Sequence, residues 1–484
     1  MGCRSGIETG LLHRFNVVLP PVVWQGGALG FHPVPLGSRP VVGRDISSEN
    51  PLVWGWTFKG SSMKNCFDLI KIWLVAVIAV SSAGVLAAND ERFSKAQALH
   101  QRLLTLDAHV DIEIPGQPSS YVGEDGRSKV EPNKMEAGGL DAAVMAVAVG
   151  PKPATEAGYA EAARIAQQEL QAVTDLLGDP AHPMVLATSP QQLLAAHANH
   201  QKALILGFQN ALILGRDVSR LTFYFRQGVR VFALTHMGHN AFADSSRPLF
   251  DAALGRHESE ARHGGLSKLG RQAIQRINAL GGIVDISQLS KAAALEVMAL
   301  SISPVIASHS NVQALTQVSR NLSDEEIDQI GRTGGVIHVA PFAGYLFDSS
   351  DPKLDGEIKA LRRAAGITEK FLYPFELYWE IDDPEVKATF LAGVRDLLGP
   401  ISLNTMLNHI DYIARRIGVE HVGIGTDFNH GSGIEGFQDA SEALNVTVGL
   451  MERGYSDADI AKIWSGNFIR VWRQAVQRRS RGTD

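Results

Sequence analysis

Short apolar runs recur along the chain from about residue 104 onward, each only four to eight residues long. They are rich in Val, Ile, Leu and Ala and lack alternation of period two, which is typical of parallel strands covered on both faces. The runs are Leu104–Ala108, Ala142–Val149, Ala203–Phe208, Val229–Leu234, Gly282–Ile286, Pro304–Ala307, Val336–Ala340 and His421–Ile424. We predict that each is a buried strand.

Helical patterns separate most of these runs. Gly265–Leu280 and Leu322–Arg332 are two of them, and Asn404–Gly418 is a third. In the second, Ser323 followed by Glu326 has the spacing of a capping box at the start of a helix. Eight strands alternating with helices favour an α/β fold of the (β/α)8 TIM-barrel type, and an open doubly wound sheet is the alternative.

Polar residues of catalytic type follow several predicted strands. In a (β/α)8 barrel the carboxyl ends of the strands carry the active site, so these side chains should converge. His109 and Asp111 are two residues apart on one strand and therefore point the same way. The full set of strand-end residues is His109, Asp111, Gln209, His236, Gln288, His309, His338 and Asp427. Four His and two Asp at such positions are typical of a divalent-metal site.

Several sequence segments resemble the membrane (renal) dipeptidase family, a branch of the metal-dependent amidohydrolase-type barrels. The matching segments are Asp107–Asp111, Leu234–His236 with Ala243–Asp244, Gly281–Ser287, Ala307–Ser310, Ser319–Leu322, Val422–Phe428 and Gly466–Phe468. The resemblance extends from about Leu104 to Arg473. It implies a barrel whose relatives are zinc metallopeptidases.

The family resemblance implies a role for each matching residue. In that family two zinc ions lie at the barrel mouth, and His109 and Asp111 match the pair that binds the first. His309 matches one ligand of the second zinc. His236 matches a His that contacts substrate, and Asp427 matches an Asp that handles protons, so these two are the expected catalytic residues.

Arg320 matches the family Arg that binds the substrate carboxylate, and a surface charge is the alternative interpretation of this residue. His338 matches no family ligand that we can place, and is either a packed core residue or a compensating ligand. His239 and His409 are expected to be structural.

Two positions depart from the family pattern. The Glu that bridges both zinc ions is Gln209 here, and the His that ends the fifth strand is Gln288. An amide offers one neutral oxygen and a nitrogen that donates, so neither residue replaces an anionic or imidazole ligand well. His309 then remains the only strong ligand of the second ion. The sequence therefore predicts a degenerate centre that holds at most one weakly bound divalent ion.

Residues 63–88 have the pattern of a bacterial secretory signal. Met63 and Lys64 begin the segment, Ile72–Val80 contains no polar residue, and small residues precede a cleavage position after Ala87. An uncleaved anchor is the alternative, since the apolar stretch is at the lower limit for spanning a bilayer. We expect export to the periplasm, and a tether to the inner membrane by the uncleaved segment is the alternative.

The segment before this signal, residues 1–62, is rich in Gly and Pro and shows no sustained periodicity. We interpret it as a non-native extension of the gene start, with a disordered native extension as the alternative. Both cysteines, Cys3 and Cys66, precede the predicted mature chain, which argues against disulfides, zinc thiolates and cysteine nucleophiles in the folded domain.

The remaining chain, residues 89–484, is predicted to be one barrel with an insertion at about residues 342–420. Within the insertion, Phe371–Glu380 is rich in aromatic residues and either roofs the pocket or packs on the flank.

The composition is that of an ordinary globular protein. The chain has 484 residues, 45% hydrophobic and 20% charged, with a net charge of −6, which does not favour nucleic-acid binding. Gly-rich phosphate-binding motifs and a Gly-x-Ser-x-Gly elbow are absent from the sequence, which leaves phosphoryl transfer and serine hydrolysis without support.

Three functions remain compatible with the sequence. The first is an exported dipeptidase-like protein that binds a peptide or modified peptide but has lost two-metal hydrolysis. The second is an active one-metal hydrolase that uses His109, Asp111, His309 and Asp427, and the third is a scaffold. The first also resembles the dipeptidase-related proteins of pyoverdine maturation, which would make the ligand a peptidic siderophore precursor and the partners other periplasmic maturation enzymes.

Overall fold

The computed structural model describes residues 90–117, 119, 121–251, 256–366 and 383–479, all of which belong to one compact unit, Val77–Asp484. The signal-like segment, the extension before it, both cysteines and the aromatic run Phe371–Glu380 lie outside these residues, so the interpretations of them stay predictions. Within the described ranges, no helix combines the length and the hydropathy needed to cross a bilayer.

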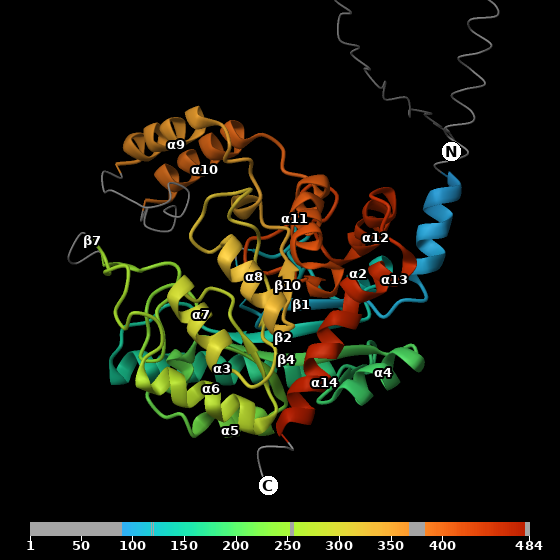
Figure 1. Ribbon diagram of the computed structural model, residues 1–484, viewed down its shortest axis with the longest axis horizontal. Coiled ribbons are helices and arrows are strands. Elements are labelled where there is room, and N and C mark those ends of the chain that lie inside the picture. The colour runs from blue at the N-terminus through green and yellow to red at the C-terminus, as the bar shows by residue number, and fades with distance from the viewer. Residues whose placement is uncertain (1–89, 118, 120, 252–255, 367–382, 480–484) are drawn as a thin grey trace, which may run out of the picture. The chain divides into compact units, whose positions relative to one another are not determined.

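A nearly closed barrel of eight parallel strands forms the centre of this unit (Figure 1). In order around the barrel the strands are β1 (Leu106–Asp111), β2 (Ala142–Ala148), β4 (Lys202–Gln209), β5 (Val229–Ala233), β8 (Ile283–Asp285), β9 (Ile306–Ala307), β10 (Val336–Val339) and β11 (Val422–Ile424). Beyond the end of β11, Asp427 N donates to His109 O (2.9 Å) and Asp111 N donates to Phe428 O (3.0 Å), which joins the last strand to the first. All eight predicted strands are confirmed, and so is the TIM-type fold.

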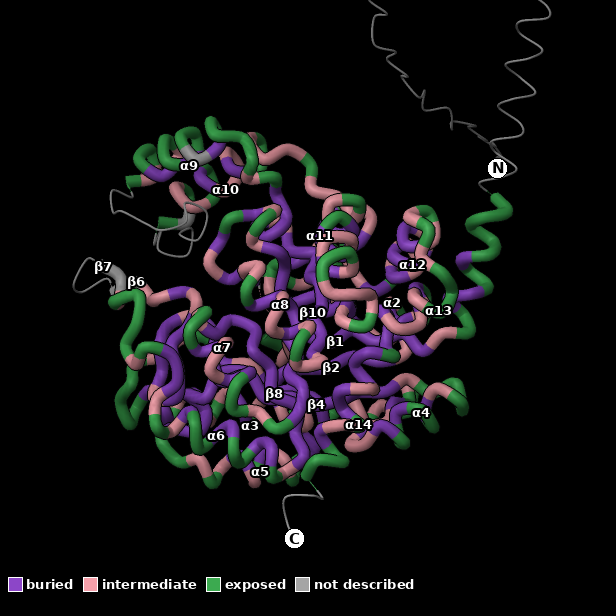
Figure 2. The backbone as a smooth tube through the Cα atoms, viewed as in Figure 1, coloured by how far each residue is buried: buried purple, intermediate pink, exposed green. Residues whose placement is uncertain are grey.

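Helices surround the strands. They are α2 (Pro132–Gly138), α3 (Glu156–Leu177), α4 (Pro190–Ala198), α5 (Arg220–Arg226), α6 (Lys268–Leu280), α7 (Lys291–Leu300), α8 (Asp324–Thr333), α11 (Leu403–Ile417), α12 (Ala443–Glu452), α13 (Asp457–Ala461) and α14 (Asn467–Arg479). The three helices expected from the sequence are α6, α8 and α11, and Ser323 and Glu326 form the predicted capping box at the start of α8. Figure 2 shows that the strands are buried, whereas the helices alternate buried and exposed residues along their length.

Two small strand pairings were not predicted. β3 (Met184–Leu186) pairs with the first residues of β4, and β6 (Phe250–Asp251) forms an antiparallel pair with β7 (Arg256–His257). Both are short, and their sequences carry no long apolar run.

Part of the hydrophobic core closes the end of the barrel at which the strands begin. Phe468 and Trp472 of α14 pack against residues at the starts of the strands, including Leu106, Ala142 and Val336. A second, larger apolar cluster fills the space between the strands and the surrounding helices. The carboxyl ends of the strands are therefore the ends that carry buried polar side chains.

The connection from β10 to β11 contains the short helix Ala343–Tyr345, α9 (Pro352–Ala364), α10 (Pro384–Leu398) and α11. Helices α9 and α10 pack on each other, set off from the helices that cover the barrel (Figure 1). Their core includes Ile358 of α9 and Phe390 of α10 and continues into Tyr345. This apolar cluster places Tyr345 at the carboxyl end of the barrel.

Candidate metal and peptide site

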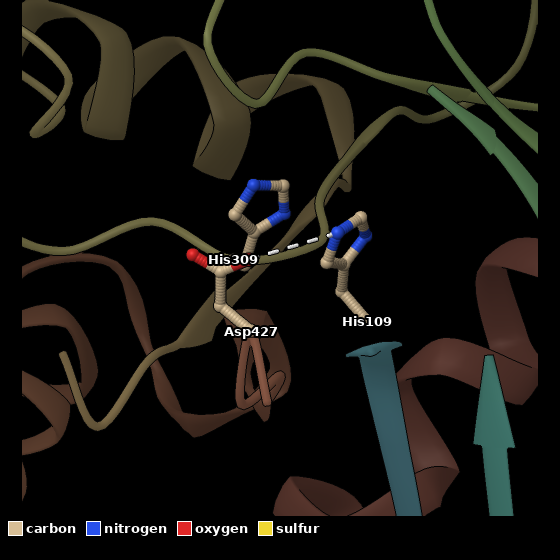
Figure 3. A group of neighbouring side chains, drawn as sticks. All are labelled: His109, His309 and Asp427. Carbon is tan, nitrogen blue, oxygen red and sulfur yellow. Dashed lines mark ion pairs between the residues drawn. The ribbon is translucent and has the colours of Figure 1, made fainter. Parts of the chain in front are cut away.

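His109, His309 and Asp427 come together from three separate places in the sequence (Figure 3). His109 lies in β1, while His309 and Asp427 follow β9 and β11. The rings of His109 and His309 stack with centroids 3.9 Å apart, and His109 Nε2 lies 3.8 Å from Asp427 Oδ1. Asp427 has a φ of +59°, a left-handed conformation that is rare outside Gly and common at functional sites. The structure therefore brings these three strand-end residues together, as the sequence predicted.

Asp111 completes one half of this cluster, as its spacing from His109 predicts. Its Oδ1 lies 3.4 Å from His109 Nε2. Both atoms are buried and have no hydrogen-bond partner among the described residues. The ligand atoms that lie within 4.8 Å of one another among the described residues are those of His109, His309 and Asp427. Because His309 is partnered by amides, the ligand types that suit a single divalent ion are the imidazole of His109 and the carboxylates of Asp111 and Asp427 on either side of it. We call these three residues the first position.

The other half of the cluster consists of His309, Gln209 and Gln288, which we call the second position. The amide nitrogens of Gln209 and Gln288 lie 3.4 Å and 3.2 Å from His309 Nε2. An amide nitrogen donates a hydrogen bond and does not ligate a metal. The residues of the second position therefore do not fit the second zinc ion of the family.

The tautomer of His309 follows from the residues behind it. Ser308 Oγ lies 2.5 Å from Asp285 Oδ2, and since a carboxylate only accepts, Ser308 is the donor of this bond. The same hydroxyl lies 2.8 Å from His309 Nδ1, so its oxygen accepts a hydrogen bond from the N–H of that nitrogen. His309 Nε2 is then the acceptor that faces the two amides.

Asp111 and His430 form an ion pair beside the first position. Asp111 Oδ2 lies 2.8 Å from His430 Nδ1. Burial opposes ionisation of Asp111, but the charge and the hydrogen bond of His430, together with the nearby charge of His109, outweigh it and lower the pKa of this carboxyl. Burial likewise disfavours the charged imidazole of His430, and Asp111 reverses this and raises the pKa of His430.

His236 lies at the site through its contact with His430. The two Nε2 atoms are 3.2 Å apart, and the rings meet edge to face with centroids 4.9 Å apart. Burial, followed by the charges of His430 and Arg247, lowers the pKa of His236 well below its usual value. His236 therefore enters the site as a neutral imidazole.

Arg320 is 2% exposed, which rules out the surface-charge interpretation. One of its guanidinium nitrogens donates to His309 O at 2.6 Å, and the guanidinium lies 4.4 Å from the centre of the Tyr345 ring. These contacts place Arg320 beside the second position. Its predicted role towards a carboxylate stays a prediction.

The other three histidines have structural contacts. His338 Nδ1 lies 2.9 Å from Ala307 O, and burial lowers the pKa of this His to about 4. His239 contacts Ser259 O and His409 accepts from Val312 N. His338 lies inside the barrel against Gly423, where a Cβ atom would be 2.2 Å from His338 Cδ2. Of the two alternatives for His338, the packed core residue fits these contacts.

Three residues of the site were not singled out from the sequence. His430 follows Asp427 closely, and a His so near a matched strand end is a signal that could have been used. Arg247 and Tyr345 carry no such signal. Arg247 donates to Gln288 Oε1 (2.6 Å) and to Tyr345 Oη (3.0 Å). It lies in the loop after β5 and not directly at the end of that strand.

Comparison with known proteins shows the family of the chain. A model of the membrane dipeptidase family (peptidase family M19) matches residues 93–483. Dipeptidase tcpJ of Claviceps purpurea is 29% identical over 307 residues, which cover 63% of this chain and 58% of the relative. Dipeptidase aclJ of Aspergillus oryzae is 30% identical over 276 residues, which cover 57% of this chain and 52% of the relative. The chain thus spans little more than half the length of these two fungal proteins.

Solved structures give a longer match. The probable dipeptidase PvdM from Pseudomonas aeruginosa is 34% identical, with a TM-score of 0.71, and the match covers 80% of this chain and 99% of that chain. An amidohydrolase from Pseudomonas aeruginosa shares the fold at 19% identity and a TM-score of 0.57, with 79% and 99% covered. Since the family model matches most of its residues, the chain belongs to the membrane dipeptidase family.

Proposed function

We propose that this protein binds a peptide or modified peptide at the barrel mouth and has lost the two-zinc hydrolysis of its family. The observation that carries this proposal is the pair of amides, from Gln209 and Gln288, that face His309 Nε2. Without a second ion and a bridging carboxylate, the site lacks the two-metal arrangement that activates water and stabilises the transition state.

Peptide-binding groups remain beside the altered position. Arg320 presents a planar guanidinium of the kind that holds a carboxylate through two parallel hydrogen bonds. His236 Nδ1 is buried and has no hydrogen-bond partner among the described residues, so it is available to a ligand carbonyl or amide. Tyr121 adds an aromatic ring 5.7 Å from that of His430. These residues would recognise a ligand that has a carboxylate at one end and a peptide group near its middle.

The ligand that we propose is a peptidic siderophore precursor of the pyoverdine kind, in the periplasm, with other maturation enzymes as partners. The signal-like pattern of residues 63–88 and the 34% identity to PvdM support this choice. The N-terminal segment would provide export or a membrane tether.

The proposal is tested on the protein purified as exported by its host. Metal content is measured after equilibration with excess zinc, while dipeptide binding is followed by calorimetry and hydrolysis by release of free amino acid. We expect at most one zinc per chain, and binding without turnover. Two zinc ions per chain with ordinary dipeptidase turnover would overturn the proposal.

A second candidate function is a one-metal hydrolase, which the first position specifically favours. His109 Nε2 and Asp111 Oδ1 are buried and aimed at each other without a hydrogen bond, as ligand atoms would be. A bound ion would supply an activated water near neutral pH. Burial raises the pKa of Asp427, which suits a carboxyl that takes up and returns a proton. One zinc per chain, with turnover that His109→Ala abolishes, would select this function instead.

A further inference from the structure

Arg247 is fixed beside Gln288 by the backbone as well as by its side chain. Ser245 forms an antiparallel bridge with Leu289, and Ser246 N donates to Gln288 O at 2.9 Å. The next residue is Arg247, which is 5% exposed. The loop after β5 therefore places this guanidinium against the end of β8, where Gln288 of the second position lies.

The guanidinium determines which way the Gln288 amide points. Arg247 donates to Gln288 Oε1 at 2.6 Å, a short charge-assisted hydrogen bond. Because the amide oxygen is held by Arg247, the amide nitrogen is turned toward His309 Nε2 at 3.2 Å. Gln288 has a φ of +66°, so the backbone also adopts an uncommon conformation to present this side chain.

The lone pair of His309 that could ligate a metal thus receives an amide hydrogen instead. His309 Nδ1 already donates to Ser308, so Nε2 is its only lone pair in the plane of the ring. Gln209 supplies another amide nitrogen 3.4 Å from the same atom. Restoring the family ligands at positions 209 and 288 would remove both amides but would leave the cationic Arg247 in place.

We propose that Arg247 takes the place of the second metal ion, both by orienting Gln288 onto His309 and by placing a fixed positive charge beside that position. This inference rests on the proposed function, in which the second position holds no metal. It goes further by naming the residue that keeps the ion out. A fixed cation repels a divalent ion strongly in a buried site, where water screens charges poorly.

The test is a cobalt(II) titration of full-length variants, followed by visible absorbance, with metal stoichiometry measured independently after dialysis. The starting variant is Gln209→Glu with Gln288→His, which restores both family ligands. To it are added Arg247→Met, which removes the charge, or Arg247→Lys, which keeps the charge without the planar fork. Arg230→Met is the matched control, because Arg230 binds backbone carbonyls of Thr188 and Phe225 away from the site.

We expect one tightly bound ion in the starting variant and in its Arg247→Lys and Arg230→Met derivatives. The Arg247→Met derivative should bind a second ion about tenfold or more tightly than these, since one positive charge has been removed. Thermal unfolding of each metal-free variant verifies that it is folded. If Arg247→Met is unstable, Arg247→Gln provides the same comparison with a polar neutral side chain.

Two results would overturn the inference, and they separate it from the proposed function. A second ion bound equally well with Arg247 present would show that Arg247 is no barrier, while the proposed function stands. Failure of every variant, Arg247→Met included, to bind a second ion would remove Arg247 as the cause of exclusion. Two ions in the unaltered protein would instead contradict the proposed function itself.

Discussion

The two halves of the site differ in how their polar atoms are satisfied. At the first position, His109 Nε2 and Asp111 Oδ1 are buried, close together and without hydrogen bonds among the described residues. At the second, His309 Nε2 faces two amides, one of them held by a guanidinium. Buried polar groups are normally hydrogen-bonded, so the first half is arranged for a ligand, whereas the second satisfies itself. Strand ends of one barrel can therefore differ, one set presenting atoms to a ligand and another satisfying its atoms internally.

The largest expected effect is on zinc affinity, and it distinguishes the first position from the second. Asp111→Asn should lower zinc affinity about 100-fold or more, because it removes an anionic ligand from the first position. Gln288→Ala should change zinc affinity by less than about threefold, because a neutral amide that donates contributes little as a ligand. Competition with a chromophoric chelator measures both. Equal losses in the two variants would contradict the assignment of metal binding to the first position.

The next prediction concerns the peptide rather than the metal. Arg320→Ala should weaken binding of a dipeptide about 10- to 100-fold, which corresponds to the loss of a charge-assisted pair of hydrogen bonds. The same dipeptide with an amidated C-terminus should bind the unaltered protein as weakly as the free acid binds the variant. Calorimetry of the four combinations measures the coupling. If amidation weakens binding to Arg320→Ala as much as to the unaltered protein, Arg320 does not hold the carboxylate.

The fold was predictable because a parallel barrel buries each strand on both faces, which leaves uninterrupted apolar runs in the sequence. His109, Asp111, His309 and Asp427 were predictable because strand ends of such a barrel meet at one mouth. The residues that the sequence did not indicate reach the site through loops. Arg247 arrives there because its neighbour Ser246 pairs with the backbone of Gln288. Pairings of this kind depend on the path of the loop and have no periodic signature.

A smaller effect is expected from the packing beneath the first position. A Cβ atom on Gly423 would lie 2.2 Å from the His338 ring, which is itself buried against Phe468. Gly423→Ala should therefore lower the free energy of unfolding by about 1 to 3 kcal/mol, as overpacking does. Gly150→Ala is the matched control, because nothing lies within 4 Å of its added Cβ. Urea denaturation that gives the two variants equal stability would show that the barrel interior adjusts to the extra methyl group.

A pH-dependent effect is expected from the residue that supports the second position. His409 accepts a hydrogen bond from Val312 N, which belongs to the segment that follows His309. Burial lowers the pKa of His409 to about 3, so the folded state favours the neutral ring. The stabilisation is complete above the usual pKa of about 6.5 and is lost as the pH falls toward 3, at about 1.4 kcal/mol per pH unit.

His409→Gln keeps an acceptor for Val312 N but does not titrate. The stability difference between the unaltered protein and this variant should therefore stay constant above pH 7.5 and shift in favour of the variant as the pH falls from 6 to 4. Urea denaturation at a series of pH values measures it. Curves that remain parallel down to pH 4 would mean that the pKa of the His409 ring in the folded protein is close to its usual value. The second position would then owe its rigidity to Arg247 and Gln288, and not to the helix behind it.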